Sequence, residues 1–255
     1  MRGKMSLSLE KLKILNRLPV LVHEKSNSAI ISDIHLGYED AMASQGIYLP
    51  RLQLKRAKNI INEILSQGFT KIVIAGDLKH VFEKLTRQER AEILELISSS
   101  VRNKAKEIIL VKGNHDTFIG NLLKDIGIDV IDDYLDLGDG IYITHGHKLI
   151  DEIKNSQFVI MGHEHPSIEI SLSGSKVRLQ SLLKMPLKGG STALILPAIG
   201  LYQTGTVLNL DKSSYLSPIS RDLGIIEESI PIIIDKEIGL IELPQLGLLF
   251  NAKNK

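Results

Sequence analysis

The chain has 255 residues, of which 43% are apolar, with a formal net charge of +1 and no cysteine. This length is enough for one large domain or two small ones, with a sizeable buried core. The near-zero net charge excludes a global field that would draw the chain to nucleic acid or to a membrane. The absence of cysteine excludes disulfides and thiolate metal ligands.

The amino-terminal segment does not resemble a targeting sequence. Its first twenty residues carry charges throughout, among them Arg2, Glu10 and Arg17. A signal peptide needs an uncharged apolar stretch, and a membrane-spanning helix needs about 20 mostly apolar residues in a row. We therefore expect a cytoplasmic protein with no membrane partner.

Strand-like and helix-like patterns alternate from Ala29 to His165. A short buried strand is expected at Ala29–Ser32, and a helix is expected at Arg51–Gln67, between Pro50 and Gly68. The capping-box spacing at 86–89 predicts a second long helix that continues through Val101. Further strands are expected at 71–75, 107–111, 141–144 and 158–161, and short helices at 118–126 and 149–154. Such alternation is typical of a layered α/β fold.

The pattern changes after His165. Strand candidates at 167–172 and 176–179 flank Ser173-Gly174-Ser175, which predicts a hairpin, and further candidates lie at 193–197, 205–210, 230–234 and 240–243. We expect residues 166–255 to complete a second sheet. Residues 1–255 would then form a single domain whose motif core is 29–165.

Seven of the eight histidines lie in five short motifs, each directly after an apolar run. The motifs are Asp33-Ile34-His35, Gly76-Asp77-Leu78-Lys79-His80, Gly113-Asn114-His115-Asp116, His145-Gly146-His147 and Gly162-His163-Glu164-His165. Each motif alone could be a turn or a loop tip, since Gly, Asn and Asp favour turns. Because loops at the carboxyl ends of strands converge on one crevice in open α/β sheets, the five together indicate one site. Imidazole, carboxylate and amide ligands suit divalent metals such as manganese, iron or zinc.

Other residues near the motifs receive more ordinary interpretations. His23, the eighth histidine, stands in a polar stretch and is expected to be exposed. Strand alternation predicts that Glu164 points away from its neighbours His163 and His165. Tyr38 and Phe82, with Tyr48, fall near the metal loops and are among the few residues that could stack on nucleic-acid bases.

The motif set DxH, GD, GNHD, HGH and GHxH resembles the calcineurin-like metallophosphoesterase superfamily over residues 29–165. This resemblance implies an α/β fold of four layers, an α/β/β/α sandwich in which helices flank two mixed β-sheets. It also implies a metal site at the carboxyl ends of the strands, with two divalent ions ~3.5–4 Å apart.

The same resemblance implies a role for each motif residue. Asp33, His35 and His165 would hold the first metal, and Asn114, His145 and His163 would hold the second. Asp77 would bridge the two. A hydroxide that bridges the metals would attack phosphorus, with His115 beside the leaving oxygen and Asp116 orienting its imidazole.

The second motif narrows the substrate. Protein Ser/Thr phosphatases of the superfamily carry GDxVDRG there, whereas Gly76-Asp77-Leu78-Lys79-His80 contains no arginine. A histidine three residues after the bridging aspartate resembles the SbcD-like repair nucleases, so His80 is expected to contact a nucleic-acid phosphate. The alternative for His80 is a loop residue that is hydrogen-bonded to backbone.

A second resemblance extends over nearly the whole chain. Residues 33–37 (DIHLG), 46–50 (GIYLP) and 196–198 (LPA) resemble the ICC-like phosphoesterases of archaea and bacteria. Some of these are similar to manganese-dependent phosphodiesterases or nucleases and are encoded beside DNA helicases.

The resemblances favour a two-metal phosphodiesterase, a nuclease that hydrolyses DNA, with Mn²⁺ in the site and a DNA helicase or translocase as partner. Zn²⁺, Fe²⁺, Co²⁺ and Ni²⁺ are alternative metals. A small-molecule nucleotide phosphodiesterase or pyrophosphatase is the alternative function. A non-catalytic scaffold is disfavoured, because every expected ligand is present. The apolar strands after Thr192 leave a homodimer open.

Overall fold

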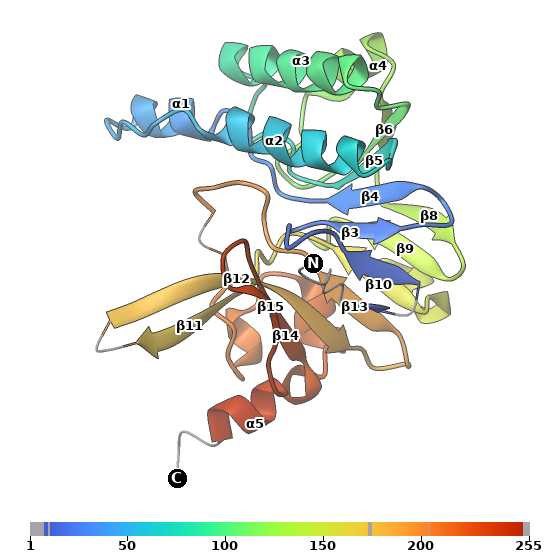
Figure 1. Cartoon of the computed structure of the whole chain (residues 1–255), viewed down its shortest axis with the longest axis vertical. Coiled ribbons are helices and arrows are strands. Elements are labelled where there is room, and N and C mark those ends of the chain that lie inside the picture. Colours follow the sequence, from blue (N-terminus) through green and yellow to red (C-terminus); the bar gives the residue numbers. More distant parts are fainter. Residues whose placement is uncertain (1–7, 10, 173–174, 204, 252–255) are drawn as a thin grey trace, which may run out of the picture.

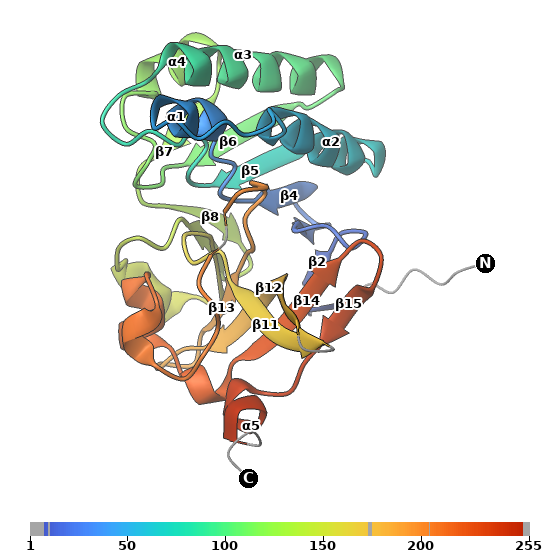
Figure 2. The same ribbon diagram turned by 90° about the vertical axis from the view of Figure 1, so that its left-hand side faces the viewer.

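The structure is a computed structural model that describes residues 8–9, 11–172, 175–203 and 205–251. In this part of the chain the strands form two sheets that pack face to face, with helices on both outer surfaces (Figures 1 and 2). The α/β/β/α layering that the sequence predicts is confirmed.

The first sheet contains seven strands in the order in which they occur in the chain. They are β1 (Ser8–Leu9), β2 (Leu12–Ile14), β3 (Leu21–His23), β4 (Ser28–Ile31), β5 (Lys71–Ala75), β6 (Glu107–Val111) and β7 (Asp129–Ile131). Strands β4 to β7 are parallel, and β1 to β3 extend the sheet in antiparallel fashion beyond β4. The carboxyl ends of β4, β5 and β6 therefore share one edge.

The second sheet has the order β15-β14-β12-β13-β10-β9-β8, and β11 pairs with β12. Its strands are β8 (Tyr134–Gly138), β9 (Ile141–Thr144), β10 (Phe158–Met161), β11 (Ser167–Leu172), β12 (Ser175–Pro186), β13 (Thr192–Ile195), β14 (Ile230–Asp235) and β15 (Gly239–Glu242). Strands β9, β10 and β13 are parallel to one another. This sheet thus also directs several carboxyl ends to one edge.

Alternation along the strands divides the apolar residues between separate cores. On β5, Ile72 and Ile74 pack against the outer helices, whereas Val73 and Ala75 face the second sheet. The first outer layer consists of α1 (Tyr38–Ser44), α2 (Gln53–Ser66), α3 (Arg87–Arg102) and α4 (Gly120–Asp125). Helix α3 begins with the expected capping box between Thr86 and Glu89.

The outer layer on the second sheet is built from short helical turns. It contains η1 (Asp151–Asn155), η2 (Lys212–Ser214), η3 (Ile219–Leu223), η4 (Ile226–Glu228) and α5 (Leu246–Asn251). Their apolar side chains, such as Ile219 and Leu246, pack on Val159 and Ile195 of the sheet. These turns are too short to be stable through their own hydrogen bonds alone, so packing on the sheet must stabilise them.

Several expected elements match the structure, and others do not. The strands at 71–75, 107–111, 141–144 and 158–161 have the predicted bounds. The prediction of a strand at 205–210 is wrong, because only Val207 makes an isolated bridge there, to Ser167. β11 and β12 pair as a hairpin up to Leu172 and Ser175, while positions 173 and 174 of the expected turn lie outside the described residues.

His23 departs from its expected exposure. It ends β3, is 2% exposed, and its Nδ1 lies 2.8 Å from Ser26 Oγ. Strand pairing with β2 and β4 covers it, which a local polar pattern cannot reveal. None of the helices in the described part of the chain combines the length and apolarity that crossing a bilayer would need.

Candidate metal centre

The five histidine motifs follow β4, β5, β6, β9 and β10, and each leaves its strand at the carboxyl end. The two sheets face each other at this edge, so loops that are distant in the sequence meet. The structure brings together the side chains of Asp33, His35, Asp77, Asn114, His145, His163 and His165, with His80 and His115 beside them.

Many of these residues adopt backbone conformations that L-amino acids avoid. Asp33, His35, Asp77, His163 and His165 all have positive φ, between 45° and 69°. A non-glycine residue in this region costs about 1–2 kcal/mol, and such strain concentrates at functional sites. The backbone conformations that direct these side chains to one point therefore cost several kcal/mol of folding free energy in total.

Two glycines allow the loops to approach the carboxylates. A Cβ at Gly113 would lie 2.1 Å from Asp77 Oδ1 and 2.5 Å from the Asp77 backbone nitrogen. A Cβ at Gly162 would lie 2.3 Å from Asp33 Oδ2. Both glycines are required by close approach.

The first cluster contains Asp33, His35 and His165, whose ligand atoms lie within 4.8 Å of one another. His165 Nε2 is 3.0 Å from Asp33 Oδ1, and the backbone amide of His163 donates to the same carboxylate at 3.2 Å. His35 Nε2 is buried and makes no hydrogen bond within the part of the chain that the structure describes. A buried ring nitrogen without a partner is costly unless a ligand completes it.

The second cluster contains Asp77, His145 and His163. His145 Nδ1 lies 3.0 Å from the carbonyl oxygen of Ala75, so it must carry the hydrogen in a neutral ring. Its Nε2 then presents a lone pair, and it lies 3.1 Å from Asn114 Oδ1 and 3.3 Å from Asp77 Oδ2. Three acceptor atoms thus converge in this amide orientation, and a cation between them, a proton or a metal, would relieve their repulsion.

Asp77 lies between the two clusters. Its Oδ2 is 3.3 Å from His145 Nε2 in the second cluster and 3.7 Å from His35 Nε2 in the first. Its Oδ1 accepts the backbone amide of His115 at 3.0 Å. The side chain is 3% exposed, and because Oδ2 faces a ligand atom of each cluster, it could contact a cation in both.

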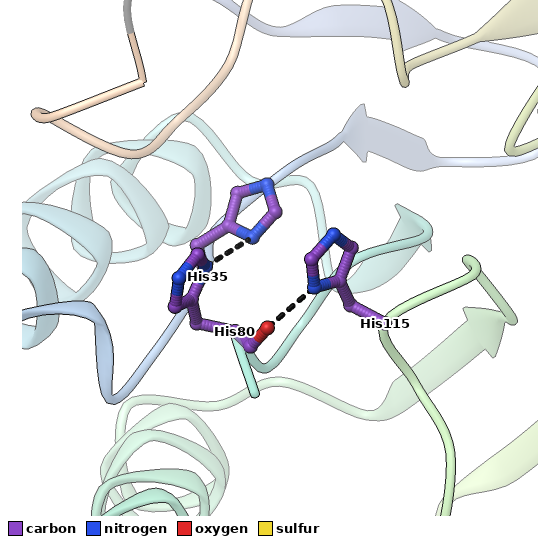
Figure 3. Close-up of side chains that lie close together, drawn as sticks. All are labelled: His35, His80 and His115. Carbon is purple, nitrogen blue, oxygen red and sulfur yellow. Dashed lines mark hydrogen bonds between the residues drawn. The ribbon is translucent and has the colours of Figure 1, made fainter. Parts of the chain in front are cut away.

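His35, His80 and His115 form a third group at the edge of the site (Figure 3). The rings of His80 and His115 stack with centroids 5.5 Å apart, and His80 Nδ1 lies 3.4 Å from His35 Nδ1. His115 Nδ1 bonds to the carbonyl oxygen of His80, which leaves its Nε2 4.0 Å from Asp77 Oδ2. His115 thus presents one ring nitrogen to the candidate metal centre.

Asp116 has different partners from the one expected. Its carboxylate accepts the backbone amides of Leu78 at 2.9 Å, Lys79 at 3.3 Å and Gly113 at 2.9 Å. It therefore holds two site loops together, and the carbonyl of His80 orients the His115 ring instead. Burial, followed by the nearby charge of Asp77, raises the pKa of Asp116 to about 6.

Burial and neighbouring charges shift the pKa values of several residues at the site. Burial lowers the pKa of His35 to about 3 and that of His163 to about 4. At His145 burial acts in the same direction, but attraction to Asp77 outweighs it and raises the pKa to about 9. Burial would raise the pKa of Asp33, but the imidazoles of His165 and His145 lower it. The negative field that favours a proton on His145 also favours a divalent cation.

Sequence reasoning missed the buried charged groups that support these loops. One carboxylate oxygen of Glu89 accepts the amides of His80 at 3.1 Å and Val81 at 2.6 Å, and the other accepts the amide of Thr86 at 2.7 Å. Glu92, on the same helix, accepts the amide of Gly37 at 2.8 Å. The capping box marks Glu89 as a helix cap, but its contact with the second motif depends on tertiary structure.

Lys79 and Glu164 complete this support. Lys79 is fully buried, and its ammonium donates to the carbonyls of Val81 and Lys84. Burial lowers the pKa of this lysine. Glu164 points away from the cluster, as alternation predicts, and accepts the amides of Leu216 at 3.0 Å and Ser217 at 2.6 Å.

The donor set fits a pair of divalent cations. It offers neutral imidazole nitrogens, buried carboxylates and an amide oxygen, which suit borderline metals. Cations held there would polarise phosphoryl oxygens and lower the pKa of water. The residues form a candidate binuclear metal site at the edge that the two sheets share.

Comparisons with known proteins agree with this geometry. Residues 27–184 match the family model described as calcineurin-like phosphoesterase. A search of curated proteins finds no match. Among solved structures, nuclease MPE from Pseudomonas putida has a TM-score of 0.64 and 18% identity, covering 93% of this chain and 98% of that one.

A phosphoesterase from E. coli, Yfce, has a TM-score of 0.41 and 17% identity, covering 68% of this chain and 79% of that one. At 18% identity, the structural likeness to nuclease MPE shows the fold alone. The family model spans more than half of the sequence and therefore shows the family. The chain therefore belongs to the calcineurin-like phosphoesterase family and is a metal-dependent phosphoesterase.

Proposed function

We propose that the protein is a two-metal phosphodiesterase, a nuclease that hydrolyses DNA, with Mn²⁺ as the working metal. The observation that carries the metal part is the convergence of His145 Nε2, Asn114 Oδ1 and Asp77 Oδ2 beside the buried Asp33 cluster. In this proposal Asp33, His35 and His165 would hold one ion. Asn114, His145 and His163 would hold the other, and Asp77 would contact both.

The charges around the site favour a diester over a monoester. Among the described residues, the ion pairs of Asp33 and Asp77 are all with histidines. Lys79, the basic residue of the second motif, turns its ammonium to backbone carbonyls. A phosphodiester carries one negative charge where a monoester carries up to two, so it needs fewer cations beyond the metals.

The protein's own residues would position and protonate the substrate. His115 Nδ1 is engaged by a carbonyl, so a second proton on this ring must lie on Nε2, the atom that faces the site. From there it can stabilise a phosphoryl oxygen or donate to the leaving oxygen. His80, stacked on His115 and beside His35, fixes the position of both rings.

Nucleic acid is proposed as the substrate because a protein of the same fold, covering nearly all of this chain, is named as a nuclease. The expected resemblance to ICC-like and SbcD-like proteins points in the same direction. The helicase or translocase partner, the homodimer and the cytoplasmic location stay predictions.

The test is a substrate panel with Mn²⁺-loaded protein. Single- and double-stranded DNA, RNA, a nucleoside triphosphate, a dinucleoside pyrophosphate, bis(p-nitrophenyl) phosphate and p-nitrophenyl phosphate are compared for wild type, Asp77→Asn and the exposed control Asp125→Asn. We expect cleavage of DNA and of the diester above the monoester, lost in Asp77→Asn and kept in Asp125→Asn. Cleavage of a nucleoside triphosphate or dinucleoside pyrophosphate with no cleavage of DNA would replace this proposal by the small-molecule alternative.

A further inference from the structure

A cleft of about 490 Å³ opens beside the candidate metal centre. His80 and His115 are among the residues that line it. One wall comes from α1 and its carboxyl end, with Ala41, Ser44 and Gln45, and the other comes from the segment that follows the second motif. This volume lies within the range of small-molecule sites, which is roughly 300–1,000 Å³.

The second wall presents an aromatic ring to solvent. Phe82 is 50% exposed, and its ring meets the His115 ring edge-on with centroids 6.1 Å apart. An exposed aromatic side chain within ring contact of a candidate catalytic histidine is available for stacking on a planar ligand.

The backbone around Phe82 is held by buried groups. The ammonium of Lys79 binds the carbonyls of Val81 and Lys84, which lie on either side of Phe82. Glu89 accepts the amide of Val81, and Thr117 Oγ1 donates to the carbonyl of Phe82. Burying the charges of Lys79 and Glu89 costs free energy. Their hydrogen bonds fix the backbone around Phe82, so the ring is preorganised for stacking.

The charges of the cleft select an uncharged ligand group. Asp40, Glu83 and Lys84 line it, which gives an excess of negative over positive charge. Asp40 is partly compensated by Arg51 at 3.7 Å, which is a weak exposed pair. A second phosphate would be repelled here, whereas a nucleobase offers planar apolar faces and polar edges that Gln45 and Ser44 can bind.

We propose that this cleft is a nucleoside subsite, in which Phe82 stacks on the base of a nucleotide whose phosphate lies at the metal centre. The inference rests on the proposed function and deepens it. It favours a nucleoside diester over a nucleoside polyphosphate as the group bound beside His115.

The binding test uses the fact that the chain contains no tryptophan. Phe82→Trp then places the only tryptophan of the chain in the cleft and keeps a stacking ring. Adenosine 5′-monophosphate should quench its fluorescence in Mn²⁺-loaded protein, whereas ribose 5-phosphate, which lacks the base, should not. Equal responses to the two compounds would overturn the proposal.

Ser98→Trp is the control for this titration, because it places a tryptophan on the surface away from the cleft. Ser98 is an exposed helix serine whose hydroxyl donates to the carbonyl three residues earlier, as that of Ser44 does, and it does not line the cleft. Its fluorescence should not respond to adenosine 5′-monophosphate. A response equal to that of Phe82→Trp would mean binding away from the cleft and would contradict the proposal.

A kinetic test separates this inference from the proposed function. The ratio of kcat/KM for thymidine 5′-(p-nitrophenyl phosphate) to kcat/KM for methyl p-nitrophenyl phosphate measures the contribution of the nucleoside. Loss of one stacked base corresponds to about a 5- to 150-fold effect, so Phe82→Ala should lower this ratio by at least about 5-fold. Ser44→Trp, which places a bulky side chain on the cleft wall formed by α1, should lower it as well.

The outcomes are distinguishable. An unchanged ratio in both Phe82→Ala and Ser44→Trp, with both diesters still cleaved, would overturn the nucleoside subsite and leave the phosphodiesterase intact. If wild-type protein cleaves neither diester, the proposed function fails. In that case the Phe82→Trp titration still decides whether the cleft binds a nucleoside.

Discussion

Gly113→Ala tests whether the loops after β5 and β6 approach as closely as the candidate metal centre requires. The new Cβ would lie 2.5 Å from the backbone nitrogen of Asp77 and 2.1 Å from its Oδ1. A flexible side-chain end could move away at little cost, but a backbone atom cannot, so the two loops must separate. The Asp77 carboxylate would lose its hydrogen bond from the amide of His115.

The cost can be worked from these contacts. Overpacking costs ~1–3 kcal/mol. Losing a hydrogen bond to a charged carboxylate costs a further ~1.5–3 kcal/mol. The lower unfolded-state entropy of alanine offsets ~0.4–1 kcal/mol of this. We expect Gly113→Ala to lower the free energy of unfolding by about 1.5–5.5 kcal/mol and to reduce the bound Mn²⁺.

Gly120→Ala is the matched control, because its Cβ would meet no atom within 4 Å and α4 begins at that residue. It should leave the stability unchanged or raise it by up to ~1 kcal/mol. Urea unfolding, with metal content measured by mass spectrometry, checks both variants. If Gly113→Ala matched Gly120→Ala in stability and in metal content, the close approach of the loops would be refuted.

Further predictions concern single side chains. His115→Ala should lower turnover by ~10²–10⁴-fold while the metal content stays near that of wild type, and loss of both metals would contradict its role. Glu89→Gln should lower the free energy of unfolding by ~1–3 kcal/mol in urea titrations, because one of its three backbone donors then faces an amide group; an unchanged stability would argue against this contact. Burial, the largest influence, lowers the pKa of His23, so this histidine contributes stability above pH 6.5 that is lost as the pH falls toward its folded pKa. The stability difference between wild type and His23→Gln should therefore be larger at pH 7.5 than at pH 5.5, and a constant difference would speak against a neutral, buried His23.

The parallel strands could be predicted because they are buried on both faces and read as short apolar runs. Ile72, Val73 and Ile74 are all fully or nearly fully buried, so the run needs no context to be recognised. A candidate ligand after each apolar run could be predicted too, because the loops at the carboxyl ends of parallel strands converge on one crevice. This explains why strands 71–75 and 107–111 have the predicted bounds.

Elements that depend on long-range pairing could not be predicted. Helix α1 has only seven residues and no side-chain N-cap, and the amide of its preceding Gly37 is held by Glu92 from α3. Strand β2 is three residues long and is stabilised between the sheets through Leu12 and Ile14. Segment 205–210 has an apolar pattern, but the carbonyl of His165 already lies 1.7 Å from where a Cβ of Gly205 would be, so the chain there packs against the metal loop.

The candidate metal ligands were accessible from the motifs, whereas the supporting groups were not. Asp116 stands next to a histidine in the sequence, but its carboxylate binds the backbone of another loop 38 positions away. The tertiary structure determines the hydrogen-bond partners of buried polar groups, so adjacency in the sequence predicts those partners poorly.

In the proposed metal centre, one chain binds two divalent cations in adjacent positions that share Asp77. Titration of metal-free wild-type protein with Mn²⁺, followed by electron paramagnetic resonance, tests it most directly. Two ions per chain, with the spectrum of a magnetically coupled pair and a separation of ~3.5–4 Å, are expected. Saturation at one ion per chain, or two ions whose spectra are those of isolated Mn²⁺, would contradict the account.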